Sequence, residues 1–304
     1  MIERKTAIIT GAASGIGLEA TRRFSQDLRY NPIYAADINP SIQTIFPQSE
    51  YPNITPLLVD VRDRDQLECM LQRTATESGR LDVVVNAAGV MYKGKPRLLW
   101  DKSKEPPKEW EEMDQVNLIA PIIVMVEAPK IMKENGGGAI INITSAKYLF
   151  PDIHHIEYQR GKMRLSRVTR GIAKDWMKRD NVRVVDVQPG NTKTNIDRGV
   201  WTEGTSKSEL EAAEIITKWW REKFGNDPKD VAEVIYQVAE GRIKGTTVYV
   251  GWDTKIGRAL YLLTFPLAGY RLDSFFFATS TLFYQVARGI NILKGKHNET
   301  PFIE

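Results

Sequence analysis

Three polar residues between positions 145 and 162 have the types and the spacing for proton transfer. Ser145 precedes Tyr158 by thirteen positions, and Lys162 follows the tyrosine by four. A spacing of four places Tyr158 and Lys162 on the same face of a helix. A tyrosine with an ordinary pKa of about 10 is a poor base at neutral pH, and a neighbouring ammonium favours its phenolate. We therefore expect Tyr158 to exchange a proton with an alcohol, Lys162 to lower the pKa of the tyrosine, and Ser145 to position and polarise the substrate oxygen.

Two histidines, His154 and His155, lie between the serine and the tyrosine, in a segment that we expect to pass the mouth of the same pocket. One interpretation is a contact with the substrate, and the other is an ordinary pair of surface histidines in a loop. The tyrosine already serves as acid and base, so no third catalytic group is needed. The chain has three histidines and one cysteine, Cys69, without the paired spacing of metal ligands. We therefore expect no metal site and no disulfide framework.

A glycine-rich segment, TGAASGIG, follows the first apolar strand of the chain. Glycines have no Cβ atom and let the backbone approach a pyrophosphate, while the helix that begins there points its amino terminus at the same group. A tight turn that is merely rich in glycine is the alternative, but a strand before it and a helix after it are the context that a dinucleotide site requires. We expect the following residues to form this part of the site: Gly11, Ser14, Gly15, Ile16 and Gly17.

Asp37 ends the second predicted strand, where a carboxylate can accept hydrogen bonds from both ribose hydroxyls and would repel a 2′-phosphate. The glycine-rich segment contains no arginine or lysine, and none directly follows Asp37, so no cation is in place for that phosphate. We therefore expect Asp37 and its neighbour Ile38 to bind the adenosine ribose of NAD, with NADP less favoured. The alternative is a turn or helix-capping aspartate, because Asn39, Pro40 and Ser41 follow.

These candidate residues lie at the ends of a regular alternation of strands and helices. Short apolar runs rich in β-branched residues predict seven strands, at residues 6–10, 32–37, 55–60, 81–86, 139–144, 182–187 and 246–250. Segments with helical periodicity fill the gaps, for example 18–28, 65–75 and 230–240. Continuous apolar strands are typical of a sheet buried on both faces. The predicted fold is therefore α/β, a Rossmann-type, doubly wound parallel sheet of about seven strands with helices on both faces.

From about residue 4 to residue 251 the sequence resembles the short-chain dehydrogenase/reductase family. The resemblance rests on motifs in the order and spacing of that family: TGAASGIG, Asp60-Val61 after the third strand, NAAG at 86–89, Trp110 followed seven positions later by Asn117, Ser145, YQRGK at 158–162 and PGNTKT at 189–194. A single YxxxK motif arises by chance, whereas this set in this order is specific. The resemblance implies an oxidoreductase that transfers a hydride between an alcohol carbon and a nicotinamide dinucleotide.

The resemblance also implies roles for residues outside the glycine-rich segment. Asp60 and Val61 would flank the adenine ring, and Asn117 resembles the family residue that holds a water molecule against the lysine. Thr192 and Thr194 resemble the residues that hold the nicotinamide carboxamide, although the family more often has an apolar residue where Thr192 stands. The remaining residues that we expect to line the cofactor cleft are Asn86, Ala87, Ala88, Gly89, Tyr158, Lys162, Pro189 and Gly190.

The helix predicted around Tyr158 departs from the family pattern. Where members usually have small residues that let two such helices pack across a dimer, this chain has Arg160, Met163 and Arg164. Like charges brought together across a two-fold axis are costly to bury unless each finds a partner. We therefore expect no tightly packed self-contact of this helix, and the oligomeric state stays open.

We expect residues 1–251 to form the dinucleotide-binding domain, with a variable substrate lid at about 195–226. Trp201, Trp219 and Trp220 give this segment an apolar character and make Trp201 a candidate substrate contact, although the other two fit packing of the lid on the core equally well. The expected activity is thus an NAD-dependent dehydrogenase for a hydrophobic secondary alcohol. Two alternatives stay open. One is a ketone reductase in the cell, because the reaction is reversible, and the other is a non-catalytic dinucleotide-binding regulator or scaffold.

Composition favours an ordinary soluble protein that binds a small molecule. Of 304 residues, 42% are hydrophobic, and the formal net charge of +4 is too small to indicate a nucleic-acid partner. The amino terminus reads as a first strand and not as a signal peptide, so we expect a cytoplasmic location.

Residues 252–304 follow the last predicted strand, and we expect them to form a helical C-terminal extension. Its two apolar runs, 259–270 and 275–287, are each too short to span a bilayer, and Pro266 bends the first. Packing on the lid or on a neighbouring subunit is one interpretation. The other is a peripheral membrane contact through these aromatic runs and their basic flanks, which would let an apolar substrate enter from lipid.

Overall fold

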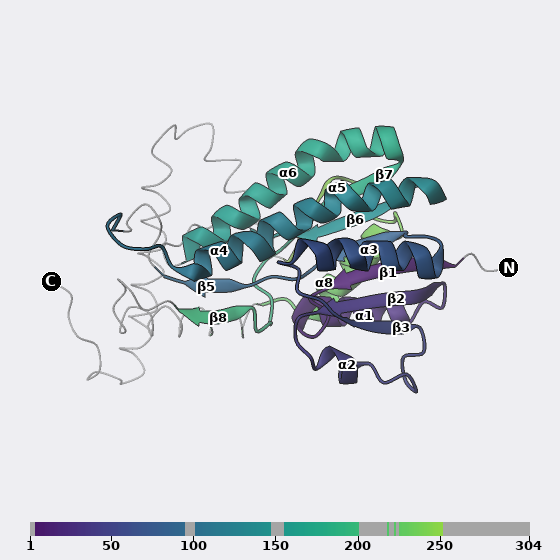
Figure 1. Cartoon of the computed structure of the whole chain (residues 1–304), viewed down its shortest axis with the longest axis horizontal. Coiled ribbons are helices and arrows are strands. Elements are labelled where there is room, and N and C mark those ends of the chain that lie inside the picture. The colour runs from purple at the N-terminus through teal and green to yellow at the C-terminus, as the bar shows by residue number, and fades with distance from the viewer. Residues whose placement is uncertain are drawn as a thin grey trace.

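A seven-stranded parallel sheet forms the centre of the part of the chain that the structure describes. In this computed structural model that part comprises residues 4–94, 101–146, 155–200, 218, 222 and 225–251, with the backbone alone for 197–200. The strand order β3-β2-β1-β4-β6-β7-β9 confirms the predicted doubly wound fold (Figure 1). The strands are β1 (Lys5–Thr10), β2 (Tyr30–Asp37), β3 (Ile54–Leu58), β4 (Val83–Asn86), β6 (Gly138–Ile143), β7 (Val182–Pro189) and β9 (Thr247–Val250).

Helices cover both faces of this sheet, as the continuous apolar strands predict (Figure 1). Neighbouring residues of β1 point to opposite faces, so that Ala7 and Ile9 belong to one core and Ile8 to the other. Helices α1 and α8 pack together on the first face, and α3, α5 and α6 form the layer on the second. The helices are α1 (Gly15–Ser25), α2 (Ile42–Ile45), α3 (Arg64–Ser78), α5 (Ala120–Met132), α6 (Ile156–Asp180) and α8 (Pro228–Ala239).

One long helical run passes through the second layer. It consists of α4 (Lys108–Asp114), the π-helical turn η2 (Gln115–Ile119), α5 and the short 3-10 turn η3 (Lys133–Asn135). Within the described ranges this is the one helical run that is long and apolar enough by composition to cross a membrane, but 56% of its apolar window is buried inside the protein. Packing of α5 between α3 and α6 accounts for this composition, because the central helix of a layer is covered on several sides.

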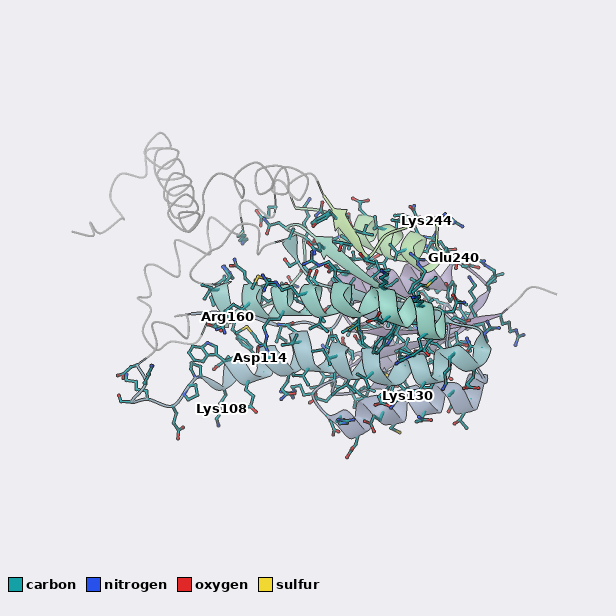
Figure 2. The ribbon with its side chains drawn as sticks, turned by 90° about the horizontal axis from the view of Figure 1, so that it is seen from above. Lys108, Asp114, Lys130, Arg160, Glu240 and Lys244 are labelled. Atoms are coloured by element: carbon teal, nitrogen blue, oxygen red, sulfur yellow. The ribbon has the colours of Figure 1, made fainter. Side chains whose placement is uncertain are left out.

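The exposed side of α6 carries the arginines that led us to expect a poor self-contact of this helix. Arg160 forms an ion pair with Glu157 at 2.9 Å, and Arg164 approaches Asp114 on α4 at 4.0 Å. Figure 2 shows Arg160 and Asp114 toward the end of the helical layer where α6 begins. Each arginine therefore has an acidic partner in its own chain, while its side chain stays about half exposed. The weak self-contact and the oligomeric state stay predictions.

The structure also contains a second, two-stranded sheet, which the sequence pattern does not predict. Its strands β5 (Met91–Lys93) and β8 (Asp197–Val200) pair in parallel, and β8 lies within the segment expected to be the substrate lid. Strands this short show too little alternation to be recognised. The C-terminal extension 252–304 and the three lid tryptophans, Trp201, Trp219 and Trp220, lie outside the described residues, so the division into domain, lid and extension stays a prediction.

Candidate active site

A pocket lies where the strand order of the sheet reverses. From β1 the chain continues to β2 and β3 on one side, while β4, β6, β7 and β9 follow on the other. The chain leaves β1 and β4 toward opposite faces of the sheet, and dinucleotides bind at this point in sheets of this type. Of the predicted residues, those that line the pocket are Gly11, Ser14, Gly15, Ile16, Asp37, Ile38, Asp60, Val61, Ala87, Ala88, Gly89, Ser145, Tyr158, Lys162, Pro189, Gly190, Thr192 and Thr194.

Three predicted residues lie behind the pocket wall instead of lining it. Gly17 belongs to the first turn of α1. Asn86, at the end of β4, is buried and donates from Nδ2 to Asn142 at 2.8 Å. Asn117 is fully buried in η2, where its Nδ2 donates to the carbonyl of Val90 at 2.7 Å and its Oδ1 accepts from the amide of Val90 at 3.1 Å. Asn117 thereby fixes the chain just after the NAAG loop, and its expected contact with a water molecule stays a prediction.

The glycine-rich loop is packed too tightly for other side chains at two positions. A Cβ on Gly17 would lie 2.2 Å from the carbonyl oxygen of Gly11, and a Cβ on Gly11 would lie 2.8 Å from Cα of Ala88. Gly11 also has a φ of +69°, which favours glycine. Thr10 completes the contact, since its Oγ1 accepts from the amides of Ala87 and Ala88 at 3.2 Å each. The amino end of α1 and the NAAG loop are thus held together in a cradle that fits a pyrophosphate.

The Asp37 carboxylate connects the end of β2 to this cradle. Its Oδ2 accepts from the amide of Ala13 in the glycine-rich loop at 2.9 Å, and its Oδ1 accepts from the amide of Asn39 at 2.8 Å. The second bond closes a turn at Asn39, and such a turn is the alternative role that the residues after Asp37 suggest. Because each carboxylate oxygen has a further lone pair, this turn leaves Asp37 able to accept from ribose hydroxyls as well.

The sequence reasoning missed two charged residues of the pocket wall, Arg62 and Glu112. The Arg62 guanidinium donates to both carboxylate oxygens of Asp60 at 2.7 to 3.0 Å, and this contact lowers the pKa of Asp60. Its Nη1 lies 3.7 Å from Glu112 on α4, which also accepts from the hydroxyl of Tyr92 at 2.7 Å. The short spacing between Asp60 and Arg62 was a usable signal, whereas nothing in the sequence pairs either residue with the distant Glu112.

Ser145, Tyr158 and Lys162 meet in this pocket, where they are 9%, 6% and 3% exposed. Ser145 follows the end of β6, and the other two lie in the first turns of α6. Ser145 and Tyr158 line the same wall of the pocket, and the neighbouring serine acts to lower the pKa of the tyrosine. Lys162 donates from Nζ to the carbonyl of Ile143 at 2.8 Å, and this nitrogen lies 6.0 Å from the centre of the Tyr158 ring. The structure therefore brings together the three residues that the sequence singles out first.

Burial favours the neutral, uncharged form of both Tyr158 and Lys162. It raises the pKa of Tyr158 to about 12, against the effect of the neighbouring Ser145. It lowers the pKa of Lys162 to about 8, against the effect of the negative charge of Asp186. The direction for Tyr158 is opposite to the lowering that we expected from Lys162, because desolvation is the larger influence in the protein alone. Lys162 itself is still mainly protonated at pH 7, so it can supply a positive charge beside the tyrosine.

The expected substrate contacts are the part of the site that the structure describes least. His155 is fully buried just before α6 and does not line the pocket. His154 and Trp201 lie outside the described residues. Their contacts with a substrate stay predictions. Ile196 and Met91, which no motif marks, do line the pocket next to the small sheet.

Known proteins are similar to this chain in both sequence and fold. A family model for short chain dehydrogenases matches residues 5–204. The chain is 30% identical over 259 residues to the 3beta-hydroxysteroid dehydrogenase 2 of Eggerthella lenta, with 82% of this chain and 95% of that protein covered. It is 25% identical over 201 residues to the NAD-dependent glycerol dehydrogenase of Listeria innocua, with 66% and 75% covered. A crystal structure of a short-chain dehydrogenase from Streptomyces avermitilis matches with a TM-score of 0.72 and 18% identity, covering 94% of this chain and 98% of that one. The chain therefore belongs to the short-chain dehydrogenase family, whose members are oxidoreductases that bind a nicotinamide dinucleotide.

Proposed function

We propose that this chain is an NAD-dependent dehydrogenase that transfers a hydride between a hydrophobic secondary alcohol and nicotinamide, with Tyr158 as the acid and base. The observation that carries the proposal is the convergence of Ser145, Tyr158 and Lys162 in the same pocket as the glycine-rich loop. A dinucleotide cradle alone suits a binding protein. A buried tyrosine, serine and lysine beside the cradle suit proton transfer from an alcohol, which favours an enzyme over a regulator.

The residues around the pocket fit NAD better than NADP. The amides at the start of α1 would hold the pyrophosphate, and Thr192 and Thr194 would hold the nicotinamide carboxamide. Asp37 would bind the adenosine ribose and repel a 2′-phosphate. Arg62 is a cation in the same wall, but Asp60 already occupies its guanidinium through both carboxylate oxygens. When bound, the dinucleotide supplies the hydride acceptor and, in its oxidised form, a positively charged ring.

Three side chains of this chain would handle the proton. Tyr158 would take the proton from the substrate hydroxyl during oxidation and return it during reduction. Ser145, which lines the pocket together with Tyr158, would hold the substrate oxygen within reach of the tyrosine. The Lys162 ammonium favours the phenolate form, and its charge acts strongly because the site is buried. Asn117 supports the site from behind by holding Val90.

The substrate class rests on the tryptophans of the lid segment and on one relative. A hydroxysteroid, which the relative from Eggerthella lenta uses by its name, is a large apolar molecule with a secondary alcohol. The relative from Listeria innocua is named for glycerol, which is small and polar. Trp201, Trp219 and Trp220 favour the apolar class for this chain, because such side chains bury large apolar areas.

The proposal is tested with the purified full-length chain, NAD or NADP, and a panel of sterols, retinoids, terpenols, short alcohols and glycerol, with the reduced cofactor measured by absorbance. On the best substrate, Tyr158→Phe is expected to reduce turnover by at least about 100-fold while the dissociation constant for NAD stays within about twofold. Tyr51→Phe is the matched control, since Tyr51 packs on Phe46 away from the pocket. Near-normal turnover by Tyr158→Phe would exclude the assigned mechanism. Tight binding of NAD without turnover of any alcohol would favour the regulator.

A further inference from the structure

A layer of buried polar side chains lies between the sheet and α6. Asn86, Asn142 and Asp186 occupy one row across β4, β6 and β7, because Asn86 pairs in register with Asn142 and Asn142 with Asp186. All three are buried. Asn86 donates to Asn142 at 2.8 Å, and Asn142 donates to Thr169 on α6 at 2.9 Å. The two amides of this row are therefore satisfied by polar neighbours, and the row ends on β7 with a carboxylate.

Asp186 is completely buried and accepts hydrogen bonds from three side chains. Thr144 donates to its Oδ1, while Ser166 and Gln188 donate to its Oδ2 at 2.6 and 2.5 Å. Donors on both oxygens favour the ionised carboxylate, although burial raises the pKa of Asp186. A buried carboxylate is costly, and packing alone would be served as well by an apolar residue. The free-energy cost of burying the Asp186 carboxylate therefore indicates that its negative charge has a role of its own.

The donors to Asp186 are close in sequence to the predicted catalytic groups. Ser166 lies one turn after Lys162 on α6, and Thr144 lies between Ser145 and Ile143, whose carbonyl accepts from Lys162 at 2.8 Å. The Asp186 carboxylate therefore joins the end of β6 to the helix that carries the lysine.

The charge of Asp186 acts on Lys162 by favouring the ammonium against burial. Of the described titratable groups, Tyr158 on α6 has its ring centre 6.0 Å from the Lys162 nitrogen, and Asp186 on β7 acts on that nitrogen through its charge. The side chain that η2 places beside Gly89, next to the same nitrogen, is the neutral Asn117. Arg170 on α6 is a further cation whose charge acts on Asp186. The shift of Tyr158 is set by burial and Ser145.

We propose that Asp186 is a positioning residue of this active site, a buried anion that keeps Lys162 in its ammonium form and holds Thr144 and Ser166 in place beside the reacting groups. The consequence for turnover rests on the proposed function. The electrostatic part concerns the protein alone and is measured without any substrate.

The experiment measures the pKa of Lys162 by NMR in the full-length chain with 13C-labelled lysine side chains. The resonance is identified by its loss in Lys162→Met. Asp186→Asn keeps the size of the side chain and removes its charge, so it is expected to lower the pKa of Lys162 by about one pH unit or more, a tenfold change in proton affinity. Asp175→Asn removes an exposed acidic side chain from α6, the helix that carries Lys162, and is expected to leave the pKa of Lys162 unchanged.

Equal pKa values for Lys162 in wild type and Asp186→Asn would overturn the proposal. If Asp186→Asn does not fold, wild type labelled at its aspartate carboxyl carbons gives a second test. All aspartate carboxyl groups are expected to be ionised at pH 7. A carboxyl group that is protonated at pH 7, and whose resonance shifts in Ser166→Ala, would overturn the proposal. Once a substrate is known, Asp186→Asn is expected to lose more turnover at pH 8 to 9 than at pH 7, as the lysine loses its proton. A chain without turnover would refute the proposed function and leave the NMR result intact.

Discussion

Replacement of Lys162 by methionine is expected to stabilise the fold while it removes activity. Burial lowers the pKa of this lysine from its ordinary value of 10.5 to about 8. At about 1.4 kcal/mol per pH unit, the difference means that the buried ammonium costs roughly 3 kcal/mol of folding free energy. Methionine fills a similar volume without a charge, so Lys162→Met removes this cost. The carbonyl of Ile143 loses a donor at the same time, which costs about 1 kcal/mol.

The pH dependence of this gain follows from the sign of the shift. The folded-state pKa of Lys162 lies below the unfolded-state value, so the unfolded chain binds more protons between pH 8 and 10.5. The cost of the ammonium is fully present below pH 8 and disappears as the pH rises through that window. Lys162→Met is therefore expected to be more stable than wild type by about 1–3 kcal/mol at pH 7, and the gain is expected to vanish near pH 10.5.

Urea unfolding at equilibrium, followed at pH 7 and at pH 10 without cofactor, measures this difference. A higher midpoint at pH 7 with an unchanged slope shows the gain. Lys174→Met on the exposed side of α6 is the matched control, and its effect is expected to stay within about 0.5 kcal/mol at both pH values. The reasoning about the buried ammonium would be refuted if Lys162→Met were less stable than wild type at pH 7. It would also be refuted if the gain in the free energy of unfolding were the same at both pH values.

Two further changes test the cofactor site. Asp37→Ala is expected to weaken NAD binding and to reduce the preference of the protein for NAD over NADP. The reason is that the acceptor for the ribose hydroxyls and the charge that repels a 2′-phosphate are lost together. Calorimetric titration with each dinucleotide measures both effects, and a wild type that prefers NADP would contradict the assignment. Gly17→Ala is expected to destabilise the fold by at least about 1–3 kcal/mol, because its Cβ would lie 2.2 Å from the Gly11 carbonyl oxygen. Gly171→Ala, in open space on α6, is the control and is expected to stabilise by up to about 1 kcal/mol in thermal unfolding. Equal effects of the two glycine changes would contradict the packing argument.

The sheet could be predicted from the sequence because its strands are buried on both faces. Such strands give continuous apolar runs, and a run of this kind is recognised even when its ends are uncertain by a residue or two. Strands β5 and β8 could not be predicted, since three and four residues carry no clear period. The widened turn η2 leaves no mark in the sequence either, although it places Asn117 against Val90.

The candidate site could be predicted where its residues end or closely follow a strand, as Asp37 and Ser145 do, or form a local motif on one helix, as Tyr158 and Lys162 do. Residues that reach the site from distant segments could not be predicted. Glu112 comes to the pocket on α4, and its contact with Arg62 depends on how the helix packs. Asp186 is harder still, because a single acidic residue within an apolar strand does not reveal its partners Thr144 and Ser166, which come from other parts of the chain. The pKa directions also depend on burial, which the sequence pattern gives only in part.

In the candidate active site, the charges that the proposed chemistry needs oppose the stability of the fold. Burial alone favours a neutral Tyr158 and a neutral Lys162, an arrangement that is stable and unreactive. Two charges act against this tendency under our proposals, namely Asp186 within the protein and the positive ring of the oxidised dinucleotide when it is bound. The tyrosine therefore becomes an effective base only when Lys162 keeps its proton and the cofactor is in place. A side-chain change that removes a buried charge is expected to stabilise the fold. The same change removes the positive charge that favours the Tyr158 phenolate, so stability and activity at this pocket should change in opposite directions.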